Sequence, residues 1–350
     1  MMGHTSILQL KMVDKFFGDN AAVERISLDI IEGEFFTIVG PSGSGKTTLI
    51  RMLVGMDTPS RGDILLRGKR INDVPANKRP TCMVFQSLAL FPHMSVGENV
   101  AYPLKCRGMD AQARKARALE CLELAHLPAE YYDRRVTQCS GGERQRVALA
   151  RALAFDPDIL FFDEPLSALD YKLKKLLEKE LKDIQRETGK TFIYITHSLE
   201  EAMVMSDRIG VMNEGRMVQI GAPREIYRNP NSRFVSEFMG EVNVLPVQAK
   251  DGKLHCAKLN TSFEVPPGSR EKDGVLIIRP EDMRFVNGAP PENGVMHGEI
   301  FNEYLLGSRV QYQVRAGDTT LLVEKQRDSA APDPSARLTF APENSMLFAE

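Results

Sequence analysis

Disulfide and secretion signals are missing from this sequence. The chain of 350 residues has five cysteines, an odd number, and no two of them stand close enough to form a CxxC pair. The N-terminus carries no charged segment followed by an apolar one, which is the pattern of a secretory signal. We therefore expect reduced thiols in a cytosolic protein.

Long apolar runs and an excess of basic residues are also absent. No apolar run approaches the roughly 20 residues that a membrane-spanning helix needs, so any membrane-spanning part of the function would belong to another chain. Residues 1–240 contain 33 Lys and Arg against 31 Asp and Glu, and residues 241–350 contain 12 against 16. Neither part has the basic excess with which proteins neutralise nucleic-acid phosphates, so we expect no nucleic-acid partner.

The composition is otherwise that of an ordinary globular protein, with 43% hydrophobic and 26% charged residues, and the length allows two or three domains. Over the first 240 residues, strand-like runs alternate with helical patterns, which predicts an α/β domain. We expect helices at 47–54 and 173–187, a hairpin at 208–220, and strands at 7–13, 22–30, 34–39, 63–66, 81–85, 159–162 and 191–196.

Two stretches depart from this alternation. From about residue 96 to residue 155, charge and alanine content rise and the pattern becomes helical, which predicts a helical insertion within the α/β domain. After Gly240, short alternating runs are separated by Gly, Pro, Asn and Asp turns, which predicts a small all-β barrel or sandwich. We expect the domain boundary near Gly240, giving domains 1–240 and 241–350. The runs lie at 242–247, 254–257, 262–265, 274–279, 295–304, 309–314 and 319–323.

A glycine-rich loop follows the apolar strand at 36–39 and matches G-x-x-x-x-G-K-[ST] in full. Its glycines let backbone N–H groups point into one cavity, and the helix that follows directs its positive end to the same place. We expect the loop to bind ATP, with Lys46 at the β- and γ-phosphates and the Thr47 hydroxyl on Mg²⁺. The loop comprises Gly40, Pro41, Ser42, Gly43, Ser44, Gly45, Lys46, Thr47 and Thr48.

Two carboxylates, Asp163 and Glu164, follow the apolar run at 159–162. A strand of a parallel sheet would deliver both to the carboxyl edge, beside the phosphate loop. We expect Asp163 to hold Mg²⁺, directly or through water, and Glu164 to polarise the water that attacks the γ-phosphate. A solvated acidic turn is the structural alternative.

A histidine and a glutamine also follow apolar strands. His197 comes after the run at 192–195, where it would sense the γ-phosphate, although a lone histidine after a strand is usually structural. Gln86 follows the run at 83–85, where a neutral amide can touch both Mg²⁺ and the attacking water. Surface glutamines are common, so the spacing of Gln86 is a weak signal by itself.

Ser140, Gly141 and Gly142 open a second helical pattern. Bare N–H groups at a helix N-terminus make a second anion site. One nucleotide does not need two such cradles on the same chain, so we expect the two to serve different halves of a nucleotide site. The simpler alternative is an ordinary serine N-cap.

Together these motifs resemble the ATP-binding subunit of an ABC transporter. The order is the phosphate loop, Gln86, the Ser-Gly-Gly signature, Asp163-Glu164 followed by Ser167-Ala168-Leu169-Asp170, and His197. The resemblance covers residues 1–240. It implies a P-loop NTPase fold, with a RecA-like α/β core, an antiparallel β subdomain near the N-terminus and a helical subdomain at about 88–157. It also implies that Asp170 belongs to the ATP site.

The resemblance assigns adenine stacking to Phe17, which precedes Gly18. Phe16 is the alternative, and both side chains could instead be core residues. Two signature positions depart from the usual Leu-Ser-Gly-Gly-Gln, because Cys139 replaces leucine and Glu143 replaces glutamine. We expect cysteine to pack as a small apolar residue. The acid at Glu143 would stand near the nucleotide and weaken polyphosphate binding, although a glutamate is otherwise favourable at a helix N-terminus.

The region after residue 240 also has a resemblance. The sequence Ile-Arg-Pro-Glu-Asp at 278–282 is similar to the hallmark of the OB-like β domain of importer ATPases for polyamines, ferric iron, sulfate, maltose and glycerol phosphate. The segments 223–227 and 234–240 resemble the connection that leads into it. A plain dimerisation module is the alternative. The stretch 240–243, Gly-Glu-Val-Asn, resembles polyamine importers and favours spermidine or putrescine as the transported solute.

The resemblance further implies a homodimer in which ATP at Lys46 of one chain is covered by Ser140 and Gly142 of the other. Glu164 would direct water in line at the γ-phosphate, with charge offset by Mg²⁺, Lys46 and His197. A groove near Gln86 would grip an integral membrane permease subunit, and a solute-binding protein would act indirectly. The chain would lie peripherally on the cytoplasmic face of the membrane. The groove would be rimmed by Leu88, Leu90 and Phe91, which could equally be core.

Two other classes of function compete with the importer. A non-transport ABC ATPase of DNA repair or ribosomes would carry a long coiled-coil insertion, or two cassettes joined by a basic linker. A regulatory binding protein would use the β domain to sense a small molecule and would hydrolyse ATP poorly. One cassette without a basic excess favours the importer over the first of these.

Overall fold

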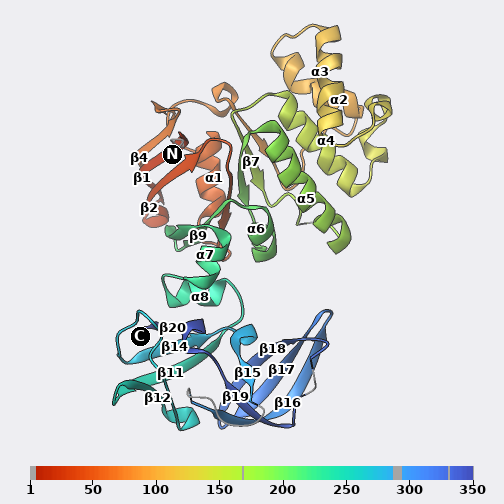
Figure 1. The fold of residues 1–350 in the computed structure, drawn as a ribbon. Coiled ribbons are helices and arrows are strands. Elements are labelled where there is room, and N and C mark those ends of the chain that lie inside the picture. The colour runs from red at the N-terminus through yellow and green to blue at the C-terminus, as the bar shows by residue number, and fades with distance from the viewer. Residues whose placement is uncertain (1–4, 168, 287–293, 330–331, 350) are drawn as a thin grey trace. The chain divides into compact units, whose positions relative to one another are not determined.

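The computed structural model describes residues 5–167, 169–286, 294–329 and 332–349 (Figure 1). The chain divides into two compact units, Met1–Asn229 and Pro230–Glu350. Gly240, where the sequence pattern changes, lies inside the second unit, after helix α8 (Arg233–Phe238). Within the described part of the chain, no helix combines the length and apolar character that crossing a membrane requires.

A six-stranded sheet forms the centre of the first unit, in the order β10-β9-β3-β8-β7-β6. The five strands from β9 to β6 are parallel, and β10 pairs antiparallel with β9 as a hairpin. Their carboxyl ends therefore meet at one edge of the sheet. The strands are β3 (Phe35–Val39), β6 (Thr81–Val84), β7 (Ile159–Asp163), β8 (Thr191–Ile195), β9 (Arg208–Asn213) and β10 (Arg216–Gly221).

The middle strands β3, β8 and β7 are buried on both faces, which explains why their sequences are mainly apolar. Phe36, Ile38 and Phe161 belong to one hydrophobic cluster, whereas Phe35 and Phe162 belong to a second. Because successive side chains of a strand point to opposite faces, the two clusters lie on the two sides of the sheet.

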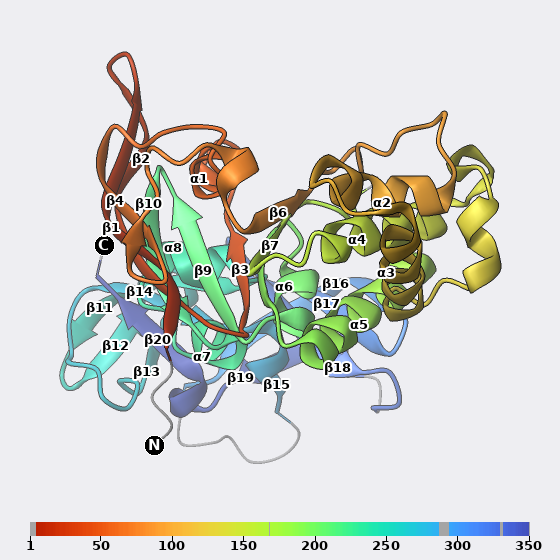
Figure 2. The same cartoon turned by 90° about the horizontal axis from the view of Figure 1, so that it is seen from above.

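A second, antiparallel sheet shares the first of these clusters. Its order is β2-β1-β4-β5, and apolar residues of β1, β2 and β4 pack with helix α1 (Lys46–Val54) and the central sheet. Seen from above, these strands lie to one side of the central sheet and the helical subdomain to the other (Figure 2). The strands are β1 (Ser6–Phe17), β2 (Asn20–Ile31), β4 (Arg61–Leu66) and β5 (Lys69–Arg70).

The predicted helical insertion consists of α2 (Val96–Cys106), α3 (Ala111–Leu124) and α4 (Gly141–Ala154). Their apolar residues pack together and join the second cluster, against the face of the sheet that carries Phe35 and Phe162. Helix α5 (Tyr171–Thr188) covers the same cluster and leads into β8. Two short helices complete the unit, α6 (Leu199–Met205) between β8 and β9 and α7 (Pro223–Arg228) after β10.

In the part of the chain that the structure describes, the second unit consists of β-strands apart from helix α8 and three short 3₁₀ helices, as its turn-rich sequence predicts. Two five-stranded antiparallel sheets enclose one hydrophobic cluster, in the orders β13-β12-β11-β14-β20 and β15-β19-β16-β17-β18. The strands β15, β19 and β20 were not among the predicted runs. The strands are β11 (Asn243–Lys250), β12 (Lys253–Cys256), β13 (Thr261–Phe263), β14 (Gly274–Ile278), β15 (Arg284–Phe285), β16 (Met296–Leu306), β17 (Arg309–Ala316), β18 (Thr319–Gln326), β19 (Ser335–Thr339) and β20 (Ser345–Phe348).

Candidate functional site

The phosphate loop lies between β3 and α1 and is shaped by its glycines. Gly43 and Gly45 have φ of +78° and +98°, which side chains other than glycine rarely adopt. A Cβ atom at Gly45 would stand 2.3 Å from the carbonyl oxygen of Ala22. Helix α1 begins directly after Gly45 without a side-chain cap or an acidic residue in its first turn. Its first N–H groups therefore remain available to an anion.

Lys46 lies over the loop, and its ammonium group is nearly buried. Its Nζ donates to the carbonyl oxygens of Gly40 at 2.8 Å and Pro41 at 2.9 Å, and to Ser44 Oγ at 3.3 Å. Burial lowers the pKa of Lys46, while the nearby Glu164 and Asp163 raise it. The ammonium group of Lys46 is thus held by neutral oxygen atoms, at a place where phosphate oxygens would replace the carbonyls.

Asp163 ends strand β7 beside this lysine. Burial and the adjoining Glu164 raise the pKa of Asp163, and Lys46 lowers it. The carboxylate therefore stands in a partly desolvated place that favours a neutralising cation. Mg²⁺ binds oxygen ligands. It usually takes one or two carboxylates from the protein and fills its other positions with water and substrate phosphate oxygens. The carboxylate of Asp163, the hydroxyl of Thr47 and the amide oxygen of Gln86 are donors of the kind that Mg²⁺ takes, so these residues fit the ion.

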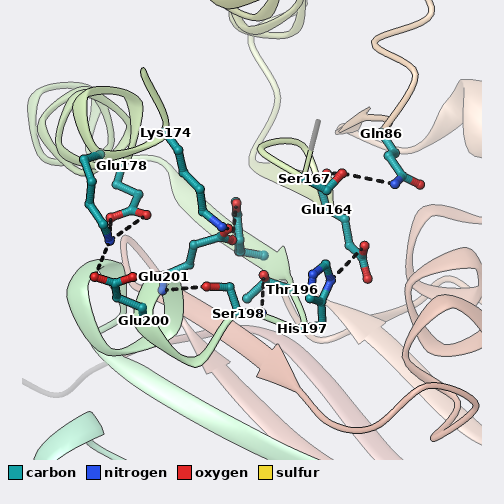
Figure 3. Close-up of polar contacts among 12 residues, drawn as sticks. Gln86, Glu164, Ser167, Lys174, Glu178, Thr196, His197, Ser198, Glu200 and Glu201 are labelled. Atoms are coloured by element: carbon teal, nitrogen blue, oxygen red, sulfur yellow. Dashed lines mark hydrogen bonds and ion pairs between the residues drawn. The ribbon is translucent and has the colours of Figure 1, made fainter. Parts of the chain in front are cut away.

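Glu164 and His197 meet at the carboxyl edge of the sheet, as the strand positions predict (Figure 3). The Nδ1 atom of His197 lies 3.1 Å from Oε2 of Glu164. Glu164 has φ of +46°, and its backbone N–H donates to the carbonyl oxygen of Ile195 at 3.0 Å. This left-handed turn directs the carboxylate away from the buried strand and toward the histidine, whose side chain is 64% exposed.

Gln86 joins the same group through Ser167, a residue of the motif after Glu164 to which the sequence assigns no role of its own. Its Nε2 donates to Ser167 Oγ at 3.1 Å, and Ser167 Oγ donates to the carbonyl oxygen of Glu164 at 2.9 Å (Figure 3). The amide of Gln86 is therefore two hydrogen bonds from the backbone of Glu164. Ala168, in the same motif, lies outside the described residues.

A cleft of about 740 Å³ opens above the loop. Ser42, Gly43, Thr47, Glu164 and His197, which the sequence assigns to the ATP site, line this cleft. The rest of the cleft wall comes from strand β2 and from the β9–β10 turn, which the sequence did not assign to the site. The turn could have been predicted as part of the site, because Glu214-Gly215 forms a hairpin turn directly after a strand of the parallel sheet. The missed lining residues are Asn20, Ala21, Ala22, Glu214 and Gly215.

The two phenylalanines at the end of β1 differ in exposure. Phe17 is 53% exposed, with the ammonium of Lys15 lying 5.0 Å from its ring centroid. Phe16 is half-buried under the guanidinium of Arg61. Phe17 lies opposite Asn20, a residue of the cleft wall, in the register of β1 and β2. Of the two rings, Phe17 is the one free to stack on a base.

The signature residues do not line the cleft on their own chain. Ser140 caps helix α4, and Gly141 lies in a separate groove with Gln86. A Cβ atom at Gly142 would stand 2.8 Å from Cδ1 of Leu173 on helix α5, so the leucine side chain would have to move to admit one. The structure thus separates the two predicted phosphate cradles.

Comparison with known proteins decides the family. Residues 23–167 match the family described as ABC transporter, and residues 276–348 match the TOBE domain. The spermidine/putrescine import ATP-binding protein PotA of Oleidesulfovibrio alaskensis is 42% identical over 344 residues, which are 96% of this chain and 89% of that protein. Its namesake in Mesorhizobium japonicum is 43% identical over 336 residues, covering 92% and 91%. The chain belongs to the ATP-binding subunits of ABC importers.

Solved structures agree with this assignment. A dimeric ATP-binding cassette in a post-hydrolysis state, bound to ADP and Pi, is 35% identical with a TM-score of 0.55, covering 62% of this chain and 99% of that chain. The cbiO1 protein of Clostridium perfringens, part of the ABC transporter complex cbiONQ, is 29% identical with a TM-score of 0.60, covering 64% and 91%. The predicted fold class is confirmed, and this importer subunit binds and hydrolyses ATP.

In this import ATPase, Glu143 completes a capping box. Its Oε2 accepts from the backbone N–H of Ser140 at 2.6 Å, and Ser140 Oγ accepts from the backbone N–H of Glu143 at 3.3 Å. Its Oε1 accepts from the Tyr131 hydroxyl at 2.7 Å and lies 3.8 Å from Nη1 of Arg134. Both carboxylate oxygens of Glu143 therefore have partners. The guanidinium of Arg134 offsets the negative charge that we expected to weaken polyphosphate binding.

Two further predicted residues of the import ATPase, Cys139 and Asp170, have structural roles on their own chain. Cys139 is buried in the core of the helical subdomain, as a small apolar residue would be, and burial raises the pKa of its thiol. The carboxylate of Asp170 accepts from the backbone N–H of Leu173 at 3.1 Å and caps helix α5. On its own chain, Asp170 thus orders a helix start and does not line the cleft.

The groove that contains Gly141 matches the predicted docking groove of the import ATPase in part. Gln86, Leu88 and Leu90 line it. Phe91 does not, because its ring packs against Tyr102, with the centroids 4.6 Å apart. Leu88 and Leu90 also pack against the core of the helical subdomain, so they contribute both to the groove and to stability.

Proposed function

We propose that the chain powers the import of spermidine or putrescine. The observation that carries this proposal is the identity of 42–43% to two spermidine/putrescine import ATP-binding proteins over more than nine-tenths of this chain. That likeness extends through the second unit, which also matches the TOBE domain. Ferric iron, sulfate, a sugar or glycerol phosphate are the solutes that a test has to exclude.

The chain acts as a homodimer with two shared ATP sites. The separation of Ser140 and Gly142 from the cleft of the same chain supports this arrangement, because a second copy can bring them to the nucleotide. The related cassette that is 35% identical is a dimer. In each site, ATP contacts Phe17 and residues 40–48 of one chain, and Ser140, Gly141, Gly142, Glu143 and Asp170 of the other.

The chemistry is an in-line attack of water on the γ-phosphate. Glu164 orients the water and accepts its proton, and the histidine nitrogen of His197 contacts the γ-phosphate. Lys46 exchanges its loop carbonyls for β- and γ-phosphate oxygens, where its charge stabilises the transition state. Bound Mg²⁺, held by Thr47, Asp163 and Gln86, would supply Lewis-acid stabilisation of the phosphate charge.

The protein lies on the cytoplasmic face of the membrane, bound peripherally to integral membrane permease subunits. The groove with Gln86, Leu88 and Leu90 receives a segment of the permease, and the hydrogen bonds from Gln86 through Ser167 to Glu164 connect that segment to the ATP site. A solute-binding protein delivers the polyamine to the other side. We propose no nucleic-acid partner.

The test is ATP hydrolysis by the complex of this chain with its permease subunits in proteoliposomes. Spermidine or putrescine, supplied with the solute-binding protein, should stimulate hydrolysis, whereas ferric iron, sulfate and maltose should not. Glu164→Gln should lower kcat by about 100-fold or more, because general-base catalysis contributes that much. Glu187→Gln makes the same chemical change at an exposed residue of α5 and should leave kcat unchanged. Stimulation by another solute alone would refute the proposed substrate.

A further inference from the structure

A hydrogen bond closes the turn that carries His197. Tyr194, in strand β8, donates from its hydroxyl to Oε2 of Glu201 in helix α6 at 2.8 Å. Tyr194 precedes the histidine and Glu201 follows it, so this bond brackets the turn between them. Tyr194 is fully buried and Glu201 is 2% exposed. Burial and the nearby Glu201 raise the pKa of Tyr194, which keeps its proton on the hydroxyl for donation.

Helix α5 holds the same carboxylate from the other side. The Nζ atom of Lys174 lies 2.5 Å from Oε1 of Glu201, so each oxygen of the buried carboxylate has its own partner (Figure 3). A buried charge without a partner is costly, whereas a fully paired one fixes a geometry. Glu201 can therefore take few positions other than this one.

Glu201 also fixes the start of helix α6. Its backbone N–H donates to Oγ of Ser198 at 3.4 Å, and the backbone N–H of Ser198 donates to Oγ1 of Thr196 at 2.9 Å. These contacts order the backbone on both sides of His197. A second ion pair joins the same two helices, because Lys175 lies 2.8 Å from Glu200 and 2.9 Å from the buried Glu178 (Figure 3).

The histidine itself has little support from its own side chain. It is 64% exposed, and its ring makes a polar contact with Glu164. Its direction is consequently set by the backbone of the turn. We propose that Glu201, held between Tyr194 and Lys174, is a positioning residue that fixes His197 against Glu164 and the γ-phosphate.

The proposal rests on the role of His197 proposed above and adds a connection. Lys174 lies one helical turn after Asp170, the residue that caps α5 and that we place at the partner's site. The ion pair with Glu201 thus joins the start of α5 to the turn of His197. A displacement of Asp170 when the dimer closes would reach the histidine of the same chain through this contact.

The experiment measures kcat and KM for ATP in the complex with the permease subunits. Glu201→Gln keeps an oxygen that accepts from Tyr194 but loses the charge that attracts Lys174. We expect kcat to fall about tenfold, because small displacements of a catalytic group have effects of this order, and the KM for ATP to change less than about twofold, because the phosphate loop is untouched. Tyr194→Phe, which removes only a hydroxyl, should act in the same direction and serves if Glu201→Gln does not fold.

The decisive comparison is the same substitution in a His197→Ala background. If Glu201 acts through the histidine, Glu201→Gln lowers kcat no further there, because the two changes remove one function. Equal losses in both backgrounds, or no loss in the wild-type background, would overturn the positioning role alone. An unchanged kcat in His197→Ala would refute the catalytic role of His197, and the positioning role with it.

Lys182→Gln is the matched control. Lys182 lies on the same helix α5, and its ion pair with Asp207 at 2.6 Å connects to the segment after α6, away from the histidine turn. This variant should leave kcat at the wild-type value in both backgrounds. A tenfold loss in Lys182→Gln would show that loosening α5 anywhere has the same effect, and it would overturn the specific role of Glu201.

Discussion

Glu143 departs from the usual signature sequence, but the helix that follows the signature still begins in the same way. A capping box accepts either glutamate or glutamine at the third helical position, so the backbone of α4 starts at Ser140 in either case. The structure adds Tyr131 and Arg134 as partners of the carboxylate. Tyr131 and Arg134 precede the signature and are not part of the motif. The motif alone therefore could not predict a partner for the charge of Glu143.

Acid should weaken the contribution of Glu143 to stability. The hydrogen bond from Tyr131 and the backbone bond from Ser140 lower the pKa of Glu143 below 4.5 in the folded chain. A lowered folded pKa gives stability that is present above the unfolded pKa and is lost as pH falls through the folded one. We expect the difference in unfolding free energy between wild type and Glu143→Gln to be constant from pH 7 to about pH 5.5 and to shrink below about pH 4.5.

The measurement is urea unfolding of both proteins at each pH. At neutral pH, ATP hydrolysis by Glu143→Gln should stay within about twofold of the wild type, because glutamine also completes a capping box. A stability difference that grows as the pH falls would contradict the assigned hydrogen bonds.

The residues of the site divide into those that strand order predicts and those that it does not. Glu164, Gln86 and His197 each follow a strand of the parallel sheet, and parallel strands bring their carboxyl ends to one edge, so the sequence predicts that they meet. Glu201 and Ser167 have no such signal. Their importance comes from contacts between segments, and a glutamate in the first turn of a helix is otherwise an ordinary surface residue.

At the scale of elements, helix α1 is held at its far end by a buried arginine. Arg79 is 1% exposed and donates to the carbonyl oxygens of Met52 and Leu53, in the last turn of the helix, and to those of Ile71 and Val74. A cation is favourable at a helix C-terminus. Gly55 makes room for it, because a Cβ atom there would stand 2.6 Å from Nε of Arg79.

Arg79→Met should destabilise the chain by about 3 kcal/mol, because buried carbonyl groups that lose their donors cost roughly 1–3 kcal/mol each and part of that cost is relieved by rearrangement. Arg51→Met is the control on the same helix. Arg51 is half-exposed and pairs with Asp57 at the surface, so its loss should cost less than about 1 kcal/mol. The sequence has no tryptophan, so circular dichroism should follow the unfolding in urea. Equal costs for the two variants would contradict the structural role of Arg79.

The elements that sequence predicts best are long or buried on both faces. The strands β3, β7 and β8 are mainly apolar in sequence and almost fully buried, and the predicted strands match them closely. Strands β15 and β20 are two and four residues long. Such short segments carry no periodicity, and their pairing with β19 and β14 supplies the order that their sequences lack.

At the scale of the whole molecule, we expect the ATP site on one chain to be incomplete. The cleft holds Lys46, Glu164 and His197, whereas the glycine signature opens into a different groove with Gln86. Each cradle combines glycine with a helix N-terminus, which favours an anion. Helix α1 has no side-chain cap, whereas the capping box of Ser140 and Glu143 already satisfies the Glu143 N–H of helix α4. In an isologous dimer, the phosphate loop of each chain would face the signature of the other. The dimer would therefore contain two complete sites, because the same two surfaces meet in each.

Two inactive variants should therefore restore activity when they form a mixed dimer. Lys46→Ala removes the cation of the loop, and Gly141→Asp puts a carboxylate into the signature, where the added Cβ meets only the flexible Cδ2 of Leu169 at 3.3 Å. In a mixed dimer, one site carries both defects and the other carries neither. Equal amounts that exchange at random give half mixed dimers, so about a quarter of the wild-type sites should be intact.

ATP hydrolysis is measured before and after the two variants are refolded together. The doubly substituted chain, which leaves no intact site in any dimer, is the control and should stay inactive after the same treatment. If the mixture is no more active than either variant alone, each chain completes its own site and the shared-site dimer is wrong.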